Sequence, residues 1–98
     1  TLLIVDNGSY GSTGDQKTFT NERTSLKDVA IGAGCKNVIE CSGEETSENL
    51  QKALDDKNNS YVIISKIKSG NVPIKPIPLN AVTIRDRFRK EIGLVTYL

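Results

Sequence analysis

Residues 1–18, TLLIVDNGSYGSTGDQKT, join a short apolar run to a polar segment that is rich in glycine. Residues 2–5 are continuously apolar and too few for a helix, which is typical of a strand buried on both faces. The run ends abruptly at Asp6, and residues 8–20 carry glycine and hydroxyl side chains without a regular period. We therefore predict a buried strand followed directly by an irregular loop.

Helix patterns follow at three places, each introduced by a residue type that caps helices. The first begins at a hydroxyl cap within residues 24–25 and stops at Gly34. The second is capped by residue 46 or 47, a Thr-Ser pair, and runs to about residue 57. Asn80 caps the third, whose apolar residues recur three and four apart: Ala81, Ile84, Phe88 and Ile92.

Two further strands are predicted at residues 37–41 and 61–67, and the second has the stronger apolar pattern. Prolines at positions 73, 76 and 78 exclude regular pairing, so residues 69–79 are expected to form an extended surface connection.

The order is thus strand, loop, helix, strand, helix, strand, linker and helix, with no internal repeat. Alternation of this kind implies right-handed crossovers and a parallel sheet. We predict an α/β fold, a βα-repeat in three layers, that forms a single domain over residues 1–98. Ligands of open parallel sheets bind at the carboxyl ends of the strands, so the loop after the first strand is the expected site.

The composition argues against several classes of protein. Hydrophobic residues make up 37% and charged residues 26%, which indicates a soluble globular chain, and a net charge of +1 gives no general attraction to nucleic acid or acidic membranes. No apolar run could span a membrane and no signal peptide opens the chain, so a cytoplasmic protein is expected.

The chain contains no histidine, the commonest acid–base group near neutral pH. It begins at Thr1, almost inside a strand, which we interpret as a fragment or a processed piece.

Other side chains are assigned to the core or to the surface. Cys35 and Cys41 fit neither a metal knuckle nor a disulfide framework, and we expect both to be buried free thiols. Tyr61 and Phe88 are expected in the core. Lys17 either contacts an anionic substrate group or is solvated, and five further charged residues are assigned to the surface: Asp55, Asp56, Lys66, Lys68 and Lys75. Arg85, Arg87, Arg89 and Lys90 line the polar face of the last helix, which is either solvated or faces another subunit.

The loop after the first strand has the chemistry of a phosphate site. Its glycines at 8, 11 and 14 permit positive φ and a close approach of backbone to ligand, and hydroxyl side chains lie between them. The spacing matches neither a Walker A loop nor the Rossmann fingerprint. Asn7 adds a side-chain oxygen that suits Mg²⁺. The alternative is a turning loop in which Asp6 or Asn7 forms an Asx-turn, and composition alone leaves both interpretations open.

The loop resembles the second half of the thiamine-diphosphate motif, which begins with Gly-Asp-Gly and ends, on a later strand, in Asn-Asn or a close variant. Residues 6–18, DNGSYGSTGDQKT, are similar to the version found in sulfopyruvate and phosphonopyruvate decarboxylases, most of all to the β subunit of the former. A softer similarity at residues 34–38, GCKNV, and 77–88, IPLNAVTIRDRF, extends over essentially the whole chain. The resemblance implies the C-terminal part of a thiamine-diphosphate-binding domain.

By this resemblance, Asn7 matches the residue whose side-chain oxygen binds Mg²⁺. Ser9 matches the residue whose backbone carbonyl completes the protein's share of the coordination. The Mg²⁺ then bridges the diphosphate of the cofactor. Tyr10 and Gly11 follow the motif where the chain bends beside the cofactor, and the decarboxylase-specific extension after them faces the active-site cavity. The implied cofactor-binding residues are Gly8, Ser9, Tyr10, Gly11, Ser12 and Thr13.

Three departures limit what this chain supplies. Asp6 replaces the commoner first Asn of the motif and has no assigned role. The Gly-Asp-Gly segment, with its Asp ligand to Mg²⁺, is absent from these residues. The activating Glu, which contacts the aminopyrimidine ring, lies on another domain or subunit in this family. No residue here is assigned a catalytic role, so we expect the isolated chain to be inactive and to need a partner subunit or domain.

The implied function is part of a thiamine-diphosphate- and Mg²⁺-dependent 2-keto acid decarboxylase. It would convert sulfopyruvate to sulfoacetaldehyde and CO₂ in coenzyme M biosynthesis, with phosphonopyruvate as the alternative substrate. Two other classes remain open: a small phosphate- or nucleotide-binding regulatory module, and an interaction domain whose loop binds nothing. A truncated parallel sheet exposes a strand edge, so self-association and an oligomer are expected, with no nucleic-acid or membrane partner.

Overall fold

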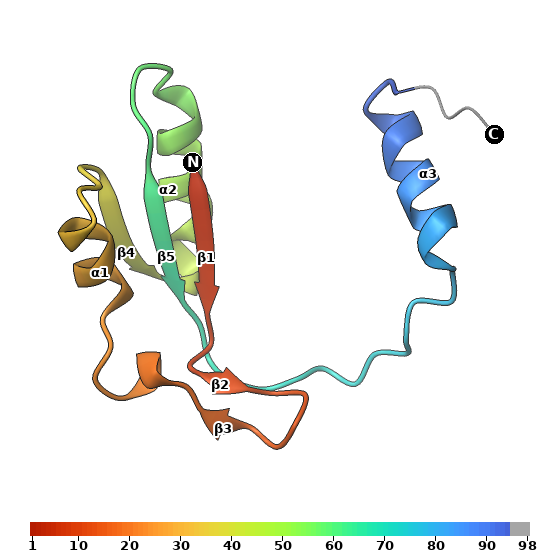
Figure 1. The fold of residues 1–98 in the computed structure, drawn as a ribbon, viewed down its shortest axis with the longest axis horizontal. Helices are drawn as coiled ribbons and strands as arrows, with labels where there is room; N and C mark the ends of the chain where they lie inside the picture. Colours follow the sequence, from red (N-terminus) through yellow and green to blue (C-terminus); the bar gives the residue numbers. More distant parts are fainter. Residues whose placement is uncertain (95–98) are drawn as a thin grey trace.

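The computed structural model describes residues 1–94 of the 98-residue chain. A parallel sheet of three strands, β1 (Leu2–Asp6), β4 (Val38–Ser42) and β5 (Val62–Lys66), forms its centre. The strand order is β1-β5-β4, so β5 pairs with both neighbours (Figure 1). In this register Asp6 lies beside Lys66 and Ser42 lies on the other side of it. The predicted α/β fold with a parallel sheet is confirmed.

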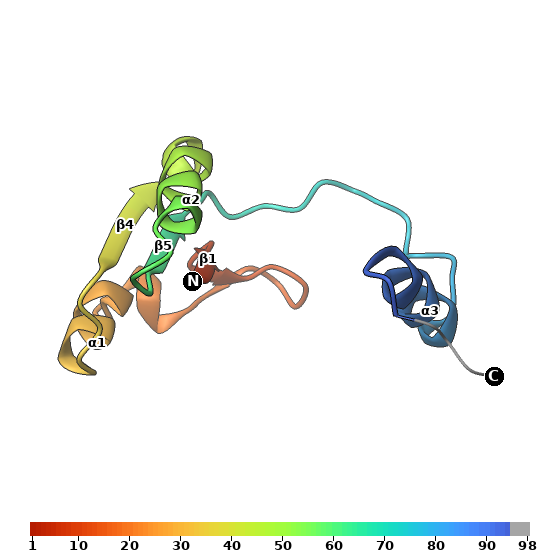
Figure 2. The same ribbon diagram turned by 90° about the horizontal axis from the view of Figure 1, so that it is seen from above.

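Helices α1 (Leu26–Gly32) and α2 (Thr46–Asp55) cover opposite faces of this sheet, which gives the three predicted layers (Figure 2). The chain passes from β1 across β5 to β4 and then returns to β5. Right-handed crossovers in opposite directions must place their helices on opposite faces. Both helices pack mainly against β4 and β5, so β1 is the less covered strand.

The core of the sheet is small and is centred on β5. Ile63 and Ile64 are completely buried, and Cys41 and Ala53 pack with Ile63. Tyr61 is partly buried against this cluster, together with Ile39 and Leu50. The prediction that both cysteines are buried is wrong for Cys35, which is exposed because it follows the end of α1 in a turn; Cys41 is buried and both are free thiols.

The helix caps are confirmed in two cases and wrong in one. The Ser25 hydroxyl oxygen accepts a hydrogen bond from the Asp28 N–H at 3.1 Å and caps α1. The cap predicted at residue 46 or 47 instead lies earlier, because a short 3-10 turn, η2 (Gly43–Glu45), precedes α2. There the Glu45 carboxylate accepts hydrogen bonds from the Ser42 N–H and hydroxyl, at 3.2 and 2.8 Å, in a capping box.

The predicted irregular loop after β1 contains regular structure. Two short antiparallel strands, β2 (Ser9–Tyr10) and β3 (Gln16–Lys17), form a hairpin, and a 3-10 turn, η1 (Phe19–Asn21), follows. These elements have two or three residues each, which is too short for a periodic sequence pattern to reveal.

The last helix, α3 (Ala81–Glu91), stands away from the sheet at the end of an extended linker (Figures 1 and 2). The predicted cap is confirmed, because the Asn80 side-chain oxygen accepts the Thr83 N–H at 2.8 Å. Phe88 was expected in the core but is 64% exposed, since the helix has no packing partner within residues 1–94. No helix in this part of the chain has the length and apolar character needed to cross a bilayer.

Candidate functional site at the carboxyl ends of β1 and β5

The carboxyl ends of β1 and β5 bring together three side chains from distant parts of the sequence, which we call the strand-end cluster: Asp6, Thr20 and Lys66. Asp6 is 8% exposed. Its Oδ2 lies 2.7 Å from the Lys66 Nζ, and its Oδ1 accepts hydrogen bonds from the Thr20 hydroxyl at 2.8 Å and the Gly8 N–H at 2.9 Å. The cluster therefore ties the loop, η1 and β5 to the end of the first strand.

The electrostatics of Asp6 follow from these contacts. Burial by itself raises the pKa of the Asp6 carboxyl. Hydrogen bonds from Lys66, Thr20 and Gly8, with the charge of Lys66, outweigh this effect and hold the pKa below its ordinary value of 3.8. The carboxylate is thus ionised at neutral pH, and its charge is neutralised by an ammonium group within the fold.

Two sequence-based assignments change here. Asp6 had no predicted role, and it proves to be the acceptor at the centre of the cluster. Lys66 was assigned to the surface, but its Nζ pairs with Asp6 and lies 3.5 Å from the Thr20 carbonyl oxygen. The pair is separated by 60 positions, so no local pattern could reveal it. The sequence offered one indication of this pair: Asp6 and Lys66 each lie at the end of a predicted strand, and neighbouring parallel strands bring such ends together.

Asn7 lies immediately beyond the cluster, where the chain leaves the sheet. Its Oδ1 accepts a hydrogen bond from the Ser9 N–H at 3.2 Å, and Asp6 makes the same kind of contact with Gly8. Both contacts are Asx-turns, which are the turns expected if these two residues serve only to turn the chain. An amide oxygen has two lone pairs, so this hydrogen bond leaves one of them able to bind a cation.

Gly8 is the glycine that this turn requires. Its φ is +66°, in the region that residues with a side chain rarely adopt. A Cβ at this position would lie 3.0 Å from the Cβ of Asn21, so a side chain would also press on η1.

The other predicted ligand residues, 9–13, belong to the hairpin rather than to the cleft beside the cluster. The Ser9 hydroxyl is buried without a hydrogen-bond partner among the described residues, and Tyr10 is 58% exposed. The Tyr10 carbonyl oxygen accepts hydrogen bonds from the N–H groups of Thr13 and Asp15.

The linker contacts the tip of this hairpin. The Asn71 side chain donates to the Gly11 carbonyl at 3.0 Å, and the Ser69 hydroxyl donates to the Asp15 carboxylate at 3.1 Å.

A polar cleft of about 140 Å³ lies beside the cluster and is lined by Asp6, Asn7, Gly8, Thr20, Asn21, Lys66 and Ile67. It is smaller than the roughly 300–1,000 Å³ of typical small-molecule pockets, so it has room for a cation or a phosphate group but not for a whole cofactor. Of the predicted ligand residues, Asn7 and Gly8 line it. A second cleft of about 190 Å³ lies next to it, and Lys66 lines both.

The donor set suits a hard cation only in part. Within residues 1–94 there is no cluster of three or more His, Cys, Asp or Glu side chains that could hold a metal. Asn7 offers one amide oxygen, a type of ligand that Mg²⁺ accepts when phosphate oxygens supply others. The Asp6 carboxylate is already engaged by three donors. Asn7 therefore stays a candidate cation ligand of this cleft.

The fold and this cleft define a class: an α/β domain with a polar cleft at the carboxyl edge of a parallel sheet, the edge where such sheets bind ligands. Comparison with curated proteins is more specific. The chain is 37% identical over 82 residues to the sulfopyruvate decarboxylase subunit beta of Methanocaldococcus jannaschii, covering 80% of this chain and 44% of that protein. It is 33% identical over 91 residues to the subunit beta of Methanococcus maripaludis, covering 93% and 48%.

A third relative, the sulfopyruvate decarboxylase of Methanosarcina acetivorans, is 27% identical over 94 residues, which are 95% of this chain and 24% of that protein. The chain spans less than half the length of these relatives. No protein-family profile and no solved structure matches it. The resemblance found in the sequence is confirmed: the chain is homologous to part of the sulfopyruvate decarboxylase β subunits.

Proposed function

We propose that this chain is part of a decarboxylase that converts sulfopyruvate to sulfoacetaldehyde and CO₂, in coenzyme M biosynthesis, with thiamine diphosphate and Mg²⁺ as cofactors. The observation that carries the proposal is the 33–37% identity to two sulfopyruvate decarboxylase β subunits over most of the chain. The polar cleft at the carboxyl edge of the sheet supports it, because it combines a cation ligand with space for one phosphate group.

The residues of the chain would have distinct tasks in such an enzyme. Thiamine diphosphate supplies, when bound, an electron sink for the carbanion left by loss of CO₂. Asn7 would give its side-chain oxygen to Mg²⁺, and the Ser9 carbonyl would add a second ligand. Gly8 lets the backbone turn sharply between them. Asp6 and Lys66 hold the start of this turn against the sheet.

The cofactor proposal is tested by binding a paramagnetic cation to the 98-residue chain. Mn²⁺ replaces Mg²⁺ at oxygen-ligand sites, and it broadens the NMR signals of nearby nuclei. With Mn²⁺ and thiamine diphosphate together, we expect selective broadening of the backbone amides of residues 7–9. The effect should be lost in Asn7→Ala and kept in Asn49→Ala, which removes an exposed amide of α2. Equal broadening in both variants would contradict the role of Asn7.

The alternative of a metal-free phosphate module is favoured by one observation, the small size of the cleft. Magnesium dependence separates the two functions. If inorganic phosphate or a nucleotide shifts the amide signals of residues 7–9 equally with and without Mg²⁺, the regulatory module is the better description. Sulfopyruvate and phosphonopyruvate are distinguished by assaying both substrates with the assembled enzyme.

A further inference from the structure

The hydrogen-bond donors around the cleft beside the strand-end cluster are already used inside the chain. The Lys66 ammonium, the Thr20 hydroxyl and the Gly8 N–H all donate to the Asp6 carboxylate, at 2.7, 2.8 and 2.9 Å. Ammonium groups, hydroxyls and loop N–H groups are also the groups that hold a bound phosphate. Asp6 therefore occupies, within this donor set, the place that an anionic ligand would take.

The next backbone amide of the loop is engaged in the same way. The Ser9 N–H donates to the Asn7 Oδ1 at 3.2 Å, as the Gly8 N–H donates to Asp6. A backbone cradle for phosphate needs successive N–H groups that are directed at the anion. Here two successive N–H groups are directed at side chains of the loop itself. The loop thus turns the chain without building such a cradle.

The side chains that line the cleft have no excess of positive charge. The basic residue among its described lining residues is Lys66, which is paired with Asp6. The neighbouring cleft, which shares Lys66, adds Arg23 but also the acidic residues Glu22 and Glu40. A phosphate group carries about −1.5 to −2 charges near neutral pH. The charge of these two clefts therefore does not favour a phosphate that arrives alone.

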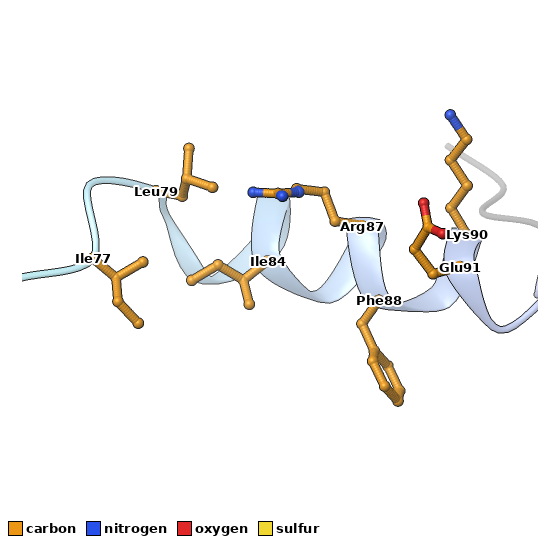
Figure 3. A pocket seen from close by; sticks show the side chains of 7 residues that line it. All are labelled: Ile77, Leu79, Ile84, Arg87, Phe88, Lys90 and Glu91. Atoms are coloured by element: carbon orange, nitrogen blue, oxygen red, sulfur yellow. The ribbon is translucent and has the colours of Figure 1, made fainter.

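The groove along α3 has a different charge balance (Figure 3). It has a volume of about 580 Å³ and is lined by residues of α3 and of the linker before it. Among its described lining residues, Arg87 and Lys90 are basic and Glu91 is acidic. An anion that is attracted by exposed basic side chains alone would bind at α3, so its effects can be told apart from binding beside Asp6.

A cation changes the balance beside Asp6. The Asn7 Oδ1 accepts one hydrogen bond and keeps a lone pair for a cation. A divalent cation would bring two positive charges, and phosphate oxygens would fill its other ligand positions. The phosphate would then be held through the cation, while Asp6 keeps its contacts with Lys66 and Thr20.

We propose that Asp6 makes anion binding at this cleft depend on a cation: by engaging Lys66, Thr20 and Gly8, it excludes free phosphate and admits a phosphate group only together with a divalent cation. Asp6 is thereby a specificity-determining residue of the cleft. The inference deepens the proposed function and rests on it for the identity of the cation. The exclusion of the free anion is measured without any metal.

The test is a titration of the 98-residue chain with inorganic phosphate in the absence of metal, followed by the amide NMR signals of residues 6–9. Asp6→Asn keeps an oxygen for the Gly8 N–H but turns an amide N–H toward Lys66, so the ammonium group is released. We expect this variant to bind phosphate at least about tenfold more tightly than the natural chain, because a positive charge becomes available.

Two variants serve as controls. Adding Lys66→Gln to Asp6→Asn should remove the gain, because the released charge is then absent. Asp55→Asn makes the same chemical change at an exposed residue of α2 and should leave the metal-free phosphate affinity as it is in the natural chain.

Equal metal-free affinity of the natural chain and Asp6→Asn would overturn the proposal, as would a gain that persists with Lys66→Gln or shifts confined to α3. If the amide spectrum of Asp6→Asn shows an unfolded chain, the natural chain decides: phosphate must shift residues 6–9 more strongly with Mg²⁺ than without it, and equal shifts would overturn the proposal. Failure of the proposed cofactor is seen separately, as Mn²⁺ broadening that is unchanged in Asn7→Ala.

Discussion

Among individual residues, Asp6 shows most clearly how the fold gives a side chain its role. The sequence places it between an apolar strand and a glycine-rich loop, where a carboxylate has no local partner. Parallel pairing of β1 with β5 brings Lys66 to it, and η1 brings the Thr20 hydroxyl. A nearly buried carboxylate then satisfies three donors at once. These contacts consequently fix the start of the loop that follows β1.

We expect Asp6→Ala to lower the free energy of unfolding by about 2 kcal/mol, because it removes hydrogen bonds from Gly8 and Thr20 that contribute about 1 kcal/mol each. The half-exposed Lys66 adds less, since its charge can be solvated. Asp6→Asn should cost less than Asp6→Ala, because its amide oxygen still accepts from Gly8. Urea denaturation measures both, with the exposed Glu44→Ala as control. Equal losses in Asp6→Ala and Glu44→Ala would contradict this role.

The stability that Asp6 contributes should depend on pH. Its pKa is below 3.8 in the folded chain, because hydrogen bonds from Lys66, Thr20 and Gly8 outweigh burial. A lowered carboxyl pKa gives stability that is fully present above the unfolded-state value and is lost as the pH falls through the folded-state value. The stability difference between the natural chain and Asp6→Asn should be constant near neutrality and shrink below about pH 4. A difference that persists unchanged to about pH 2 would argue against an ionised Asp6.

At the scale of elements, the entry to α2 is controlled by residues that precede it. Ser42 ends β4 and also opens the capping box with Glu45, so one residue terminates a strand and starts a helical turn. Thr46, the expected cap, instead donates to the Ser42 carbonyl and contacts Ser65 across the layer. Strand, turn and helix are therefore held together over very few residues.

Ser42→Ala should lower the free energy of unfolding by about 1 kcal/mol, the usual cost of losing a capping side chain. Ser47→Ala is the matched control, since Ser47 is the other residue that the sequence offered as a cap and is an exposed residue of the first turn. We expect almost no change in that variant. Thermal denaturation followed by circular dichroism compares them, and a larger loss in Ser47→Ala would contradict the assignment.

Local patterns explain which elements were predictable. The apolar runs at β1, β4 and β5 and the caps at Ser25 and Asn80 act over a few residues, so the sequence reveals them. The Asp6–Lys66 pair depends on strand order, and the exposure of Phe88 depends on where the linker carries α3. The position of Asn7 at the sheet edge was predictable from the alternation of elements. Its hydrogen bond to Ser9 and the short hairpin were not, because both arise from the folded turn.

Viewed as a whole, the molecule consists of a small sheet body and an outlying helix (Figure 1). The cleft of about 140 Å³ on the body is lined by Asn7, the residue proposed to bind Mg²⁺. A cleft of this size has room for one phosphate group but cannot enclose a substrate beside a cofactor. Catalysis by the proposed decarboxylase therefore requires surfaces other than those of residues 1–94.

We accordingly expect no CO₂ release when the isolated chain is mixed with thiamine diphosphate, Mg²⁺ and sulfopyruvate. A coupled assay for CO₂ measures this, with an active thiamine-dependent decarboxylase as the positive control. Turnover by the isolated chain that is lost in Asn7→Ala would contradict the expectation and show that this cleft is sufficient for catalysis.

The two hydrogen bonds between the linker and the hairpin tip, from Asn71 to Gly11 and from Ser69 to Asp15, have a thermodynamic consequence. They join the segment that carries α3 to the loop that carries Asn7, so the conformation of each biases the other. A ligand that favours this hairpin conformation would therefore also favour this path of the linker, and would do so by the same factor by which the linker contacts strengthen the binding of that ligand.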